Sequence, residues 1–170
     1  VGGALRHFRQ LVLAEDEGLR EIGCSVVVAQ VLERLEDGRS NILVEGRRRF
    51  RLLAVHEPEE PESEYLRGQI EWLEDEAAGA DPELQNELGA LFRRMLALME
   101  VDSPHVPGGP EALSYRIAAA VDFGTALKQQ LLEQPSEAER QRTLVTVIET
   151  LLPRLELRKQ REEAIRGNGK

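Results

Sequence analysis

The hydrophobic pattern of this 170-residue chain changes near residue 76, from a two-residue period to a helical period. Before that point apolar residues alternate, as they do in half-buried strands, and beyond it they recur at spacings of three and four. This change predicts an α+β fold with two parts. We expect a β-rich subdomain over residues 1–76 and an α-helical bundle over residues 77–170 that ends in a charged, flexible tail.

A hairpin is the clearest local prediction in the β-rich part. Ile22, Cys24, Val26 and Val28 share one side of a period-two pattern, and Asp37-Gly38 then separates this run from the apolar run 42–44. Asp-Gly between two apolar runs is a strong hairpin signal. Gly46 predicts a bulge or bend in the return strand, because glycine inside a strand usually marks one.

The return strand continues with Phe50, Leu52 and Ala54 on one face. A further strand is expected over residues 65–75, with Leu66, Ile70 and Trp72 on one face. Trp72 is the single tryptophan, and we interpret it as a core anchor.

Arginine is concentrated in the return strand, at positions 47, 48, 49 and 51. A period of two places Arg47, Arg49 and Arg51 on the face opposite Phe50 and Leu52. The sequence favours the solvated face of an antiparallel sheet, and a dedicated anion or RNA site is the alternative. With 31 acidic and 22 basic residues the net charge is −9, which disfavours nucleic acid as a partner of the whole chain.

Helix signals follow residue 76. Asp81-Pro82 predicts a helix start, and an apolar stripe follows it. Residues 102–110 predict a loop, and shorter helices are expected around Leu113–Val121 and after Asp122. Ser136 and Glu139 form a capping box for a last helix, which Pro153 should kink or end. Residues 167–170 are expected to be disordered. The first stripe comprises Leu84, Leu88, Leu91, Phe92, Met95, Leu96 and Met99.

Residues that would support catalysis are sparse. His7, His56 and His105 lack the mutual spacing of metal ligands, and we expect each to be a surface or loop residue. Cys24 lies in a valine-rich strand and is expected to be a small buried thiol. No cofactor or metal site is predicted. One cysteine allows no internal disulfide, and neither a membrane span nor a signal peptide is visible, so the predicted location is cytoplasmic.

The segment "IGCSVVVAQVLERLEDGRSNILVEGRRRFRLLAV", residues 22–55, resembles the N-terminal, substrate-binding domain of Lon proteases. The similarity lies in Ile22-Gly23, the valine run, Asp37-Gly38 and the "LVEG" of 43–46 followed by "RFRL" at 49–52. "LRGQIEWLED", 66–75, follows at the expected distance, and residues 113–148 are similar to the helical part of the family. The resemblance covers most of residues 22–155 and implies a PUA-like antiparallel sheet followed by a helical bundle.

The front of the chain departs from that pattern. Family members begin with strands of the type "LPLFPLxxxLFPG" and a segment like "IFEPRYRxLV". The first has no counterpart here, and Arg9–Val12 only faintly resembles the second. We therefore expect an incomplete PUA-like subdomain whose N-terminal strands are missing, with apolar faces and sheet edges left open.

The resemblance implies a non-catalytic bacterial module of protein quality control, associated with proteolysis, that binds unfolded or tagged client polypeptides. Without a Walker motif or a Ser-Lys pair, the expected form is a domain that stands alone and neither hydrolyses ATP nor cleaves peptide bonds. The candidate polypeptide-binding residues are Tyr65, Phe92, Met95 and Met99, although for any one residue of the helical stripe the favoured interpretation is bundle core. A separate protease, or self-association through an open sheet edge, are the further partners expected. The alternative function is RNA binding through Arg47, Arg49 and Arg51.

Overall fold

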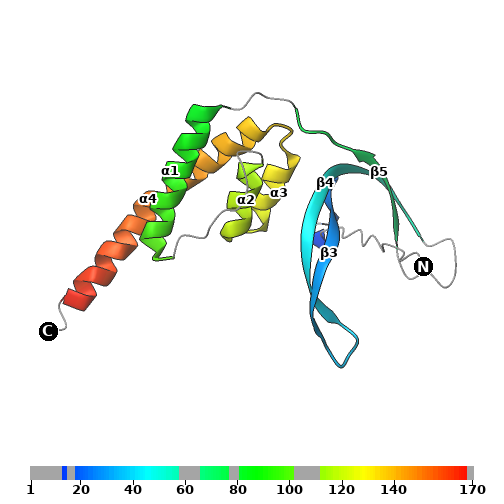
Figure 1. Cartoon of the computed structure of the whole chain (residues 1–170), viewed down its shortest axis with the longest axis horizontal. Helices are drawn as coiled ribbons and strands as arrows, with labels where there is room; N and C mark the ends of the chain where they lie inside the picture. The colour runs from blue at the N-terminus through cyan, green and yellow to red at the C-terminus, as the bar shows by residue number, and fades with distance from the viewer. Residues whose placement is uncertain (1–12, 15–17, 58–65, 77–80, 102–111, 168–170) are drawn as a thin grey trace. The chain divides into compact units, whose positions relative to one another are not determined.

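The computed structural model describes residues 13–14, 18–57, 66–76, 81–101 and 112–167. The chain forms two compact units, residues 1–74 and 75–170 (Figure 1). The first unit contains the strands and the second contains the helices.

Unit 1 is built on a three-stranded antiparallel sheet of order β3-β4-β5. Its strands are β3 (Ile22–Arg34), β4 (Ser40–His56) and β5 (Arg67–Trp72). A separate antiparallel pair is formed by the two-residue strands β1 (Leu13–Ala14) and β2 (Gly18–Leu19). Because β5 pairs with β4 only from Phe50 to His56, the remainder of the β3–β4 hairpin extends beyond β5 (Figure 1).

The predicted Asp37-Gly38 turn joins β3 to β4. The Gly38 N–H donates to the Leu35 carbonyl at 3.1 Å, and the Leu35 N–H donates to the Arg39 carbonyl at 2.8 Å. Gly38 has φ of 86°, a left-handed conformation that glycine adopts without steric cost. The Asp37 carboxylate accepts from the Arg39 N–H and guanidinium, and these hydrogen bonds lower the pKa of Asp37. The hairpin prediction is confirmed at the level of individual bonds.

The best buried apolar side chain described in unit 1 is Phe50, which is 3% exposed. Its register partner on β3 is Gly23, and a Cβ atom at that glycine would lie 2.6 Å from the Phe50 Cζ. The Phe50 ring can therefore pack against β3 at this position because Gly23 has no side chain. On β5, Trp72 meets the same ring edge to face, with centroids 6.3 Å apart.

Unit 2 contains α1 (Pro82–Met99), α2 (Leu113–Ala120), α3 (Thr125–Glu133) and α4 (Glu137–Gly167). The two predicted N-caps are formed. The Asp81 carboxylate accepts from the Leu84 N–H at 3.1 Å, and the Ser136 hydroxyl accepts from the Glu139 N–H at 3.1 Å. Each bond satisfies one of the amide groups left without a partner at a helix start.

The helices of unit 2 enclose one apolar core, in which α1 packs mainly on α4. Complete burial of an aliphatic side chain contributes roughly 1.5–3 kcal/mol, so this core supplies most of the stability of the bundle. Its buried members are Leu88, Phe92, Met95, Leu96, Ile117, Ala118, Leu131, Leu144, Ile148 and Leu152.

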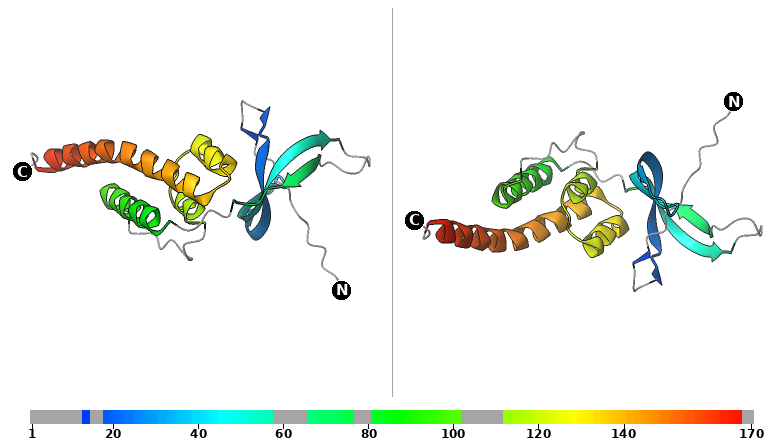
Figure 2. Two further views of the ribbon diagram at one scale, coloured as in Figure 1. Left: turned by 90° about the horizontal axis from the view of Figure 1, so that it is seen from above. Right: turned by 90° about the horizontal axis from the view of Figure 1, so that it is seen from below.

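The last helix does not end at Pro153, which corrects one of the two outcomes predicted there. α4 continues through Pro153 to Gly167, as one helix in Figure 2. Proline costs a helix interior one hydrogen bond and a clash with the preceding turn, and helices absorb this by bending. Pro153 is exposed, while its neighbour Leu152 is buried in the core. Packing on that neighbouring residue thus offsets the cost of proline. Only residues 168–170 of the expected tail lie outside the described residues.

Candidate functional site

The β3–β4 hairpin carries two bulges that change which residues of β3 share a face. From Val28 to Gln30, and again from Val31 to Glu33, β3 advances by two residues while the paired strand β4 advances by only one. Each extra residue shifts the alternation of side chains by one. The side-chain period of β3 therefore becomes three at this point. Val28, Val31 and Arg34 lie opposite Val44, Ile42 and Ser40.

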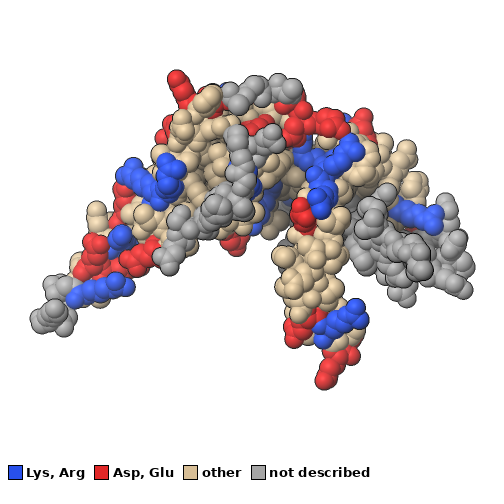
Figure 3. All heavy atoms as spheres, viewed as in Figure 1, with Lys and Arg blue, Asp and Glu red and all other residues tan. Residues whose placement is uncertain are grey.

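All of these residues except Val44 line an apolar trough of about 640 Å³ in the hairpin. The volume lies within the ~300–1,000 Å³ usual for ligand pockets. Val31 is 44% exposed and Ile42 is 41% exposed, so the apolar wall faces solvent. In Figure 3 the hairpin shows a largely uncharged band above a charged tip. The trough is lined by Val28, Val31, Arg34, Leu35, Gly38, Ser40 and Ile42.

The outer edge of β4 next to this trough is open over residues 40–48 among the described residues. β3 pairs with one side of that stretch, and β5 begins to pair with β4 only at Phe50. An open edge presents backbone N–H and C=O groups without strand partners, which suits the addition of another extended segment. Leu43 and Val44 on this stretch are also exposed.

The arginine segment of β4 contains a third bulge, at the position where Gly46 predicted one. Cys24 pairs with Arg49 and Val26 pairs with Gly46, so β4 advances by three residues where β3 advances by two. The Ser25 hydroxyl completes the interrupted ladder, since it accepts from the Arg48 N–H at 3.1 Å and donates to the Arg48 carbonyl at 3.2 Å.

This bulge overturns part of the predicted arginine face. Arg49 is 7% exposed and lies beside the buried Phe50, and it donates to the Glu74 carbonyl. Arg47 and Arg51 are exposed, as predicted. The additional residue separates Arg47 from the face that Arg49 and Arg51 share. Arg49 and Arg51 remain in regular register with β3, so the burial of Arg49 reflects its own surroundings, which include the Glu74 carbonyl.

The exposed arginines of β4 are paired with carboxylates. Arg47 lies 3.0 Å from Glu45, and Arg51 contacts Glu21 at 2.9 Å and Glu71 at 3.5 Å. Arg48 pairs with Glu74 at 2.5 Å and stacks on the Trp72 ring at 4.7 Å. The positive charge that the alternative RNA site requires is thus largely neutralised within unit 1.

Trp72 is not the core anchor that the sequence suggested, because 43% of its surface is exposed. It lies at the end of β5, where the Phe50 ring meets it on one side and the Arg48 guanidinium covers its face. A tryptophan face attracts a guanidinium electrostatically, and this contact substitutes for burial.

The polypeptide-binding residues predicted on the first helix do not form a surface. Phe92 is 4% exposed and Met95 is 1% exposed, and both belong to the core of unit 2. Met99 is half-buried and packs against the same core. This arrangement corresponds to the bundle-core interpretation of the stripe. Tyr65, the fourth predicted residue, lies outside the described residues.

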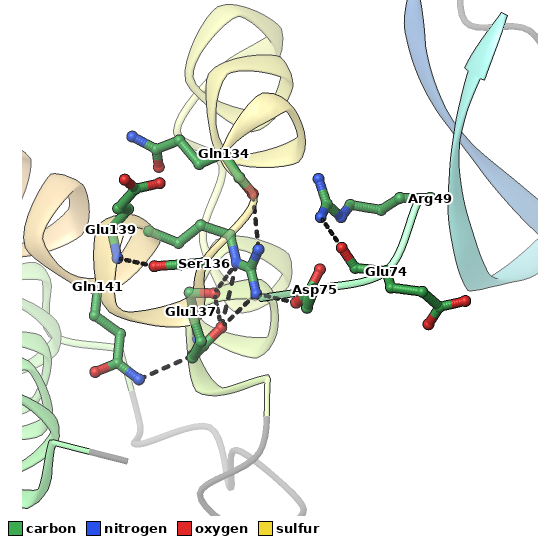
Figure 4. A network of polar contacts seen from close by, with 10 residues as sticks. Arg49, Glu74, Asp75, Gln134, Ser136, Glu137, Glu139 and Gln141 are labelled. Carbon is green, nitrogen blue, oxygen red and sulfur yellow. Dashed lines mark hydrogen bonds and ion pairs between the residues drawn. The ribbon is translucent and has the colours of Figure 1, made fainter. Parts of the chain in front are cut away.

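Unit 2 also contains a buried polar network centred on Arg140 of α4 (Figure 4). Its guanidinium donates to Asp75, to the Glu137 carboxylate at 3.0 Å, to the Ser114 hydroxyl at 3.2 Å and to the Gln134 carbonyl at 2.8 Å. It also stacks on the Tyr115 ring at 4.4 Å. Burial opposes the charge of Arg140, yet the hydrogen bonds to Asp75 and Glu137 and the nearby charges raise its pKa overall.

The network fixes the first residues of unit 2 to the start of α4. Beside the Asp75–Arg140 pair, the Glu76 N–H donates to the Pro135 carbonyl at 3.1 Å. Glu137 is held in place by the Ser114 N–H and hydroxyl and by the Gln141 amide. Because these hydrogen bonds join residues of unit 2 to one another and the central guanidinium is buried, we assign the network a structural role.

Comparison with known families identifies the chain. The family model of the ATP-dependent protease La (LON) substrate-binding domain matches residues 13–150. The chain belongs to this family. The Lon protease of Anaeromyxobacter dehalogenans (strain 2CP-C) is 29% identical over an alignment of 168 positions that covers 90% of this chain and 19% of that protein. The chain thus spans about a fifth of the length of that relative.

Solved structures of Lon N-terminal domains share the fold. The Lon N-terminal domain protein from Xanthomonas campestris has a TM-score of 0.54 at 18% identity, covering 79% of this chain and 71% of its own. The N-terminal domain of the Mycobacterium avium complex Lon protease has a TM-score of 0.57 at 23% identity, covering 79% and 73%. The predicted α+β fold is confirmed.

Chemically reactive groups are few in the described part of this Lon substrate-binding domain. It contains no group of three or more His, Cys, Asp and Glu side chains that could hold a metal ion. Cys24 is half-buried, and burial raises the pKa of its thiol despite opposing contributions from the Arg47 backbone and the Arg49 charge. His56 is exposed at the end of β4, whereas His7 and His105 lie outside the described residues. None of the described helices combines the length and apolar content needed to cross a membrane.

Reasoning from sequence missed the trough of the Lon substrate-binding domain. The signal was present, because Val28, Val31 and Arg34 follow one another at spacings of three before the Asp37-Gly38 turn. Such spacing inside a strand departs from a period of two and indicates bulges. A regular half-buried strand, as the valine run predicts, would not place these residues on one face.

Proposed function

We propose that this chain is a non-catalytic polypeptide-recognition module that binds exposed apolar segments of client proteins at the β3–β4 hairpin. The observation that carries the proposal is the exposed apolar trough beside an open stretch of β4. Membership of a substrate-binding domain family supports a role in recognition. The hairpin replaces Phe92 and Met95 as the proposed binding surface, because both of these side chains are buried and cannot contact a client.

The physical basis of binding would be the addition of a strand. An extended client segment could hydrogen-bond to the backbone of β4 residues 40–48 whatever its sequence. The apolar wall formed by Val28, Val31 and Ile42 would favour client segments with apolar side chains over polar segments. A module of this kind would favour unfolded chains, because in folded proteins these groups are already paired or buried.

Clients bound in this way would be passed to a protease. The relative from Anaeromyxobacter dehalogenans is a Lon protease, and its length beyond the matched part leaves room for other domains. We propose that clients recognised by this chain are destined for proteolysis by such domains or by a separate protease.

The test is an anisotropy titration of the chain against a labelled unfolded polypeptide and, in parallel, labelled single-stranded RNA, each at low and moderate salt. We expect polypeptide binding that persists at moderate salt. Removing apolar surface with the double variant Val31→Thr/Ile42→Thr should weaken it about tenfold, since each methyl-sized loss is worth ~0.8 kcal/mol when fully buried. Threonine preserves the strand propensity.

The matched control is Ile165→Thr, which removes the same kind of surface from an exposed position on α4. The proposal fails if polypeptide does not bind, or if the control weakens binding as much as the double variant does. RNA binding that falls steeply with salt, and that Arg47→Ala and Arg51→Ala abolish, would support the alternative function instead.

A further inference from the structure

Among the described residues that line the trough, Arg34 is the one with a charged side chain, and none carries a carboxylate. Arg34 is exposed at the end of β3 and has no hydrogen-bonding or ionic partner for its side chain within the described ranges. The arginines nearby differ, since Arg39 is bound to Asp37 and Arg47 to Glu45. An apolar wall next to a guanidinium that has no partner among the described residues is therefore a distinct feature of the hairpin.

The position of Arg34 is set by the bulges of β3. Without the two additional residues, Arg34 would not share a face with both Val28 and Val31. As it stands, the pairs Val31–Ile42 and Arg34–Ser40 are consecutive on that face, two residues apart along β4. That separation is about 7 Å in an antiparallel strand.

We propose that the trough recognises an extended client segment in which an apolar side chain is followed, two residues away, by an aspartate or glutamate. This inference rests on the proposed function and specifies its substrate class. The apolar side chain would contact Val31 and Ile42, and the carboxylate would bind Arg34. Guanidinium is suited to this role because its planar donors match a carboxylate and remain charged at any physiological pH.

Charge and periodicity both support this occupant. A lysine or arginine of the client would be repelled by Arg34, because none of the described lining residues offers it an anion. Side chains of an added strand project to the same face at every second residue, which gives the two-residue spacing between the anchor and the carboxylate. Arg34 therefore acts as a specificity residue, and the apolar wall supplies the affinity.

The test uses three labelled peptides that carry valines at alternate positions and differ only in the residue two positions after the last valine, which is Glu, Gln or Lys. All are amidated, so that the side chain is the only carboxylate compared. We expect the Glu peptide to bind about fivefold more tightly than the Gln peptide at low salt, the scale of a partly exposed ion pair, and the Lys peptide to bind most weakly.

The decisive variant is Arg34→Met, with Arg39→Met as the matched control in the same hairpin. Arg34→Met should abolish the preference for Glu over Gln while leaving affinity for the Gln peptide within about twofold, and Arg39→Met should keep the preference. Trp72 emission and far-UV circular dichroism verify that both variants are folded.

Two results overturn the inference and leave the proposed function intact. One is equal binding of the Glu and Gln peptides to the unchanged chain, and the other is a Glu preference that survives in Arg34→Met. If no peptide and no unfolded polypeptide binds, both proposals fall. Sedimentation in the absence of peptide measures whether the chain forms oligomers. If the unchanged chain is oligomeric and the double variant Val31→Thr/Ile42→Thr is monomeric, a second copy covers the trough, and this result also overturns the inference.

Discussion

Replacing Arg140 by methionine should destabilise unit 2 by about 3 kcal/mol. Removing one partner of a buried ion pair typically costs about 3–5 kcal/mol, because the remaining charge stays buried without compensation. Arg140 is buried, with only 1% of its side chain exposed. Its partners moderate the cost, since Asp75 is 43% exposed and can be hydrated. Glu137 also keeps its hydrogen bonds from Ser114 and Gln141, which places the expected loss at the lower end of that range.

The assay is urea unfolding followed by the helical far-UV signal, because the described helices all belong to unit 2. With a denaturant dependence of about 1–3 kcal/mol/M, a loss of ~3 kcal/mol lowers the midpoint by roughly 1–3 M. Methionine is chosen because it fills much of the volume of arginine without its charge. Trp72 emission provides a second signal, from unit 1.

The control is Arg142→Met, the same substitution two residues later on α4 at an exposed position. It should change stability by no more than about 0.5 kcal/mol, as is usual for surface substitutions. If Arg140→Met and Arg142→Met have the same small effect, the network does not stabilise the bundle and the assignment of a structural role is wrong.

Two further predictions concern unit 1. Gly23→Ala should cost about 1–3 kcal/mol by overpacking against Phe50, detected by Trp72 emission in urea. Gly46→Ala, whose Cβ would lie 3.4 Å from the Cys24 Sγ, should cost clearly less, and equal effects would contradict the reasoning. Because burial raises the pKa of Cys24, its contribution to stability is complete below the ordinary thiol value of 9.0 and is lost as pH rises through the higher folded value. Alkylation at pH ~8 should then be slower than for a free thiol, and Cys24→Ala should flatten the alkaline decline in stability.

Local features were predictable from the sequence, and features that depend on distant partners were not. The caps at Asp81 and Ser136 and the turn at Gly38 involve residues within a few positions of one another, so residue type and spacing determine them. The burial of Arg140 depends on Asp75, which is 65 residues away. A pattern of neighbouring residues in the sequence cannot predict a pairing over this separation.

The bulges explain the errors within the sheet. Alternation along a strand places side chains on the correct face of the sheet only where both paired strands advance by the same number of residues. β3 and β4 depart from equal steps at several places. The bulge of β4 separates Arg47 from the face that Arg49 and Arg51 share, and the two bulges of β3 produce the shared face of Val31 and Arg34, which a period of two does not predict. A strand bulge is set by cross-strand fit, which a single strand does not reveal.

The bulges of β3 also bear on the tendency of an exposed apolar hairpin to aggregate. A flat strand edge with regularly spaced donors and acceptors is a template on which copies of a chain aggregate. The bulges near Ala29 and Leu32 interrupt that spacing on β3, whereas β4 remains regular over residues 40–46. Over the part of the described hairpin that extends beyond β5, the same two bulges thus leave one regular strand edge, on β4, instead of two, so that another copy could add to β4 but would find no regular edge on β3 to continue the stack.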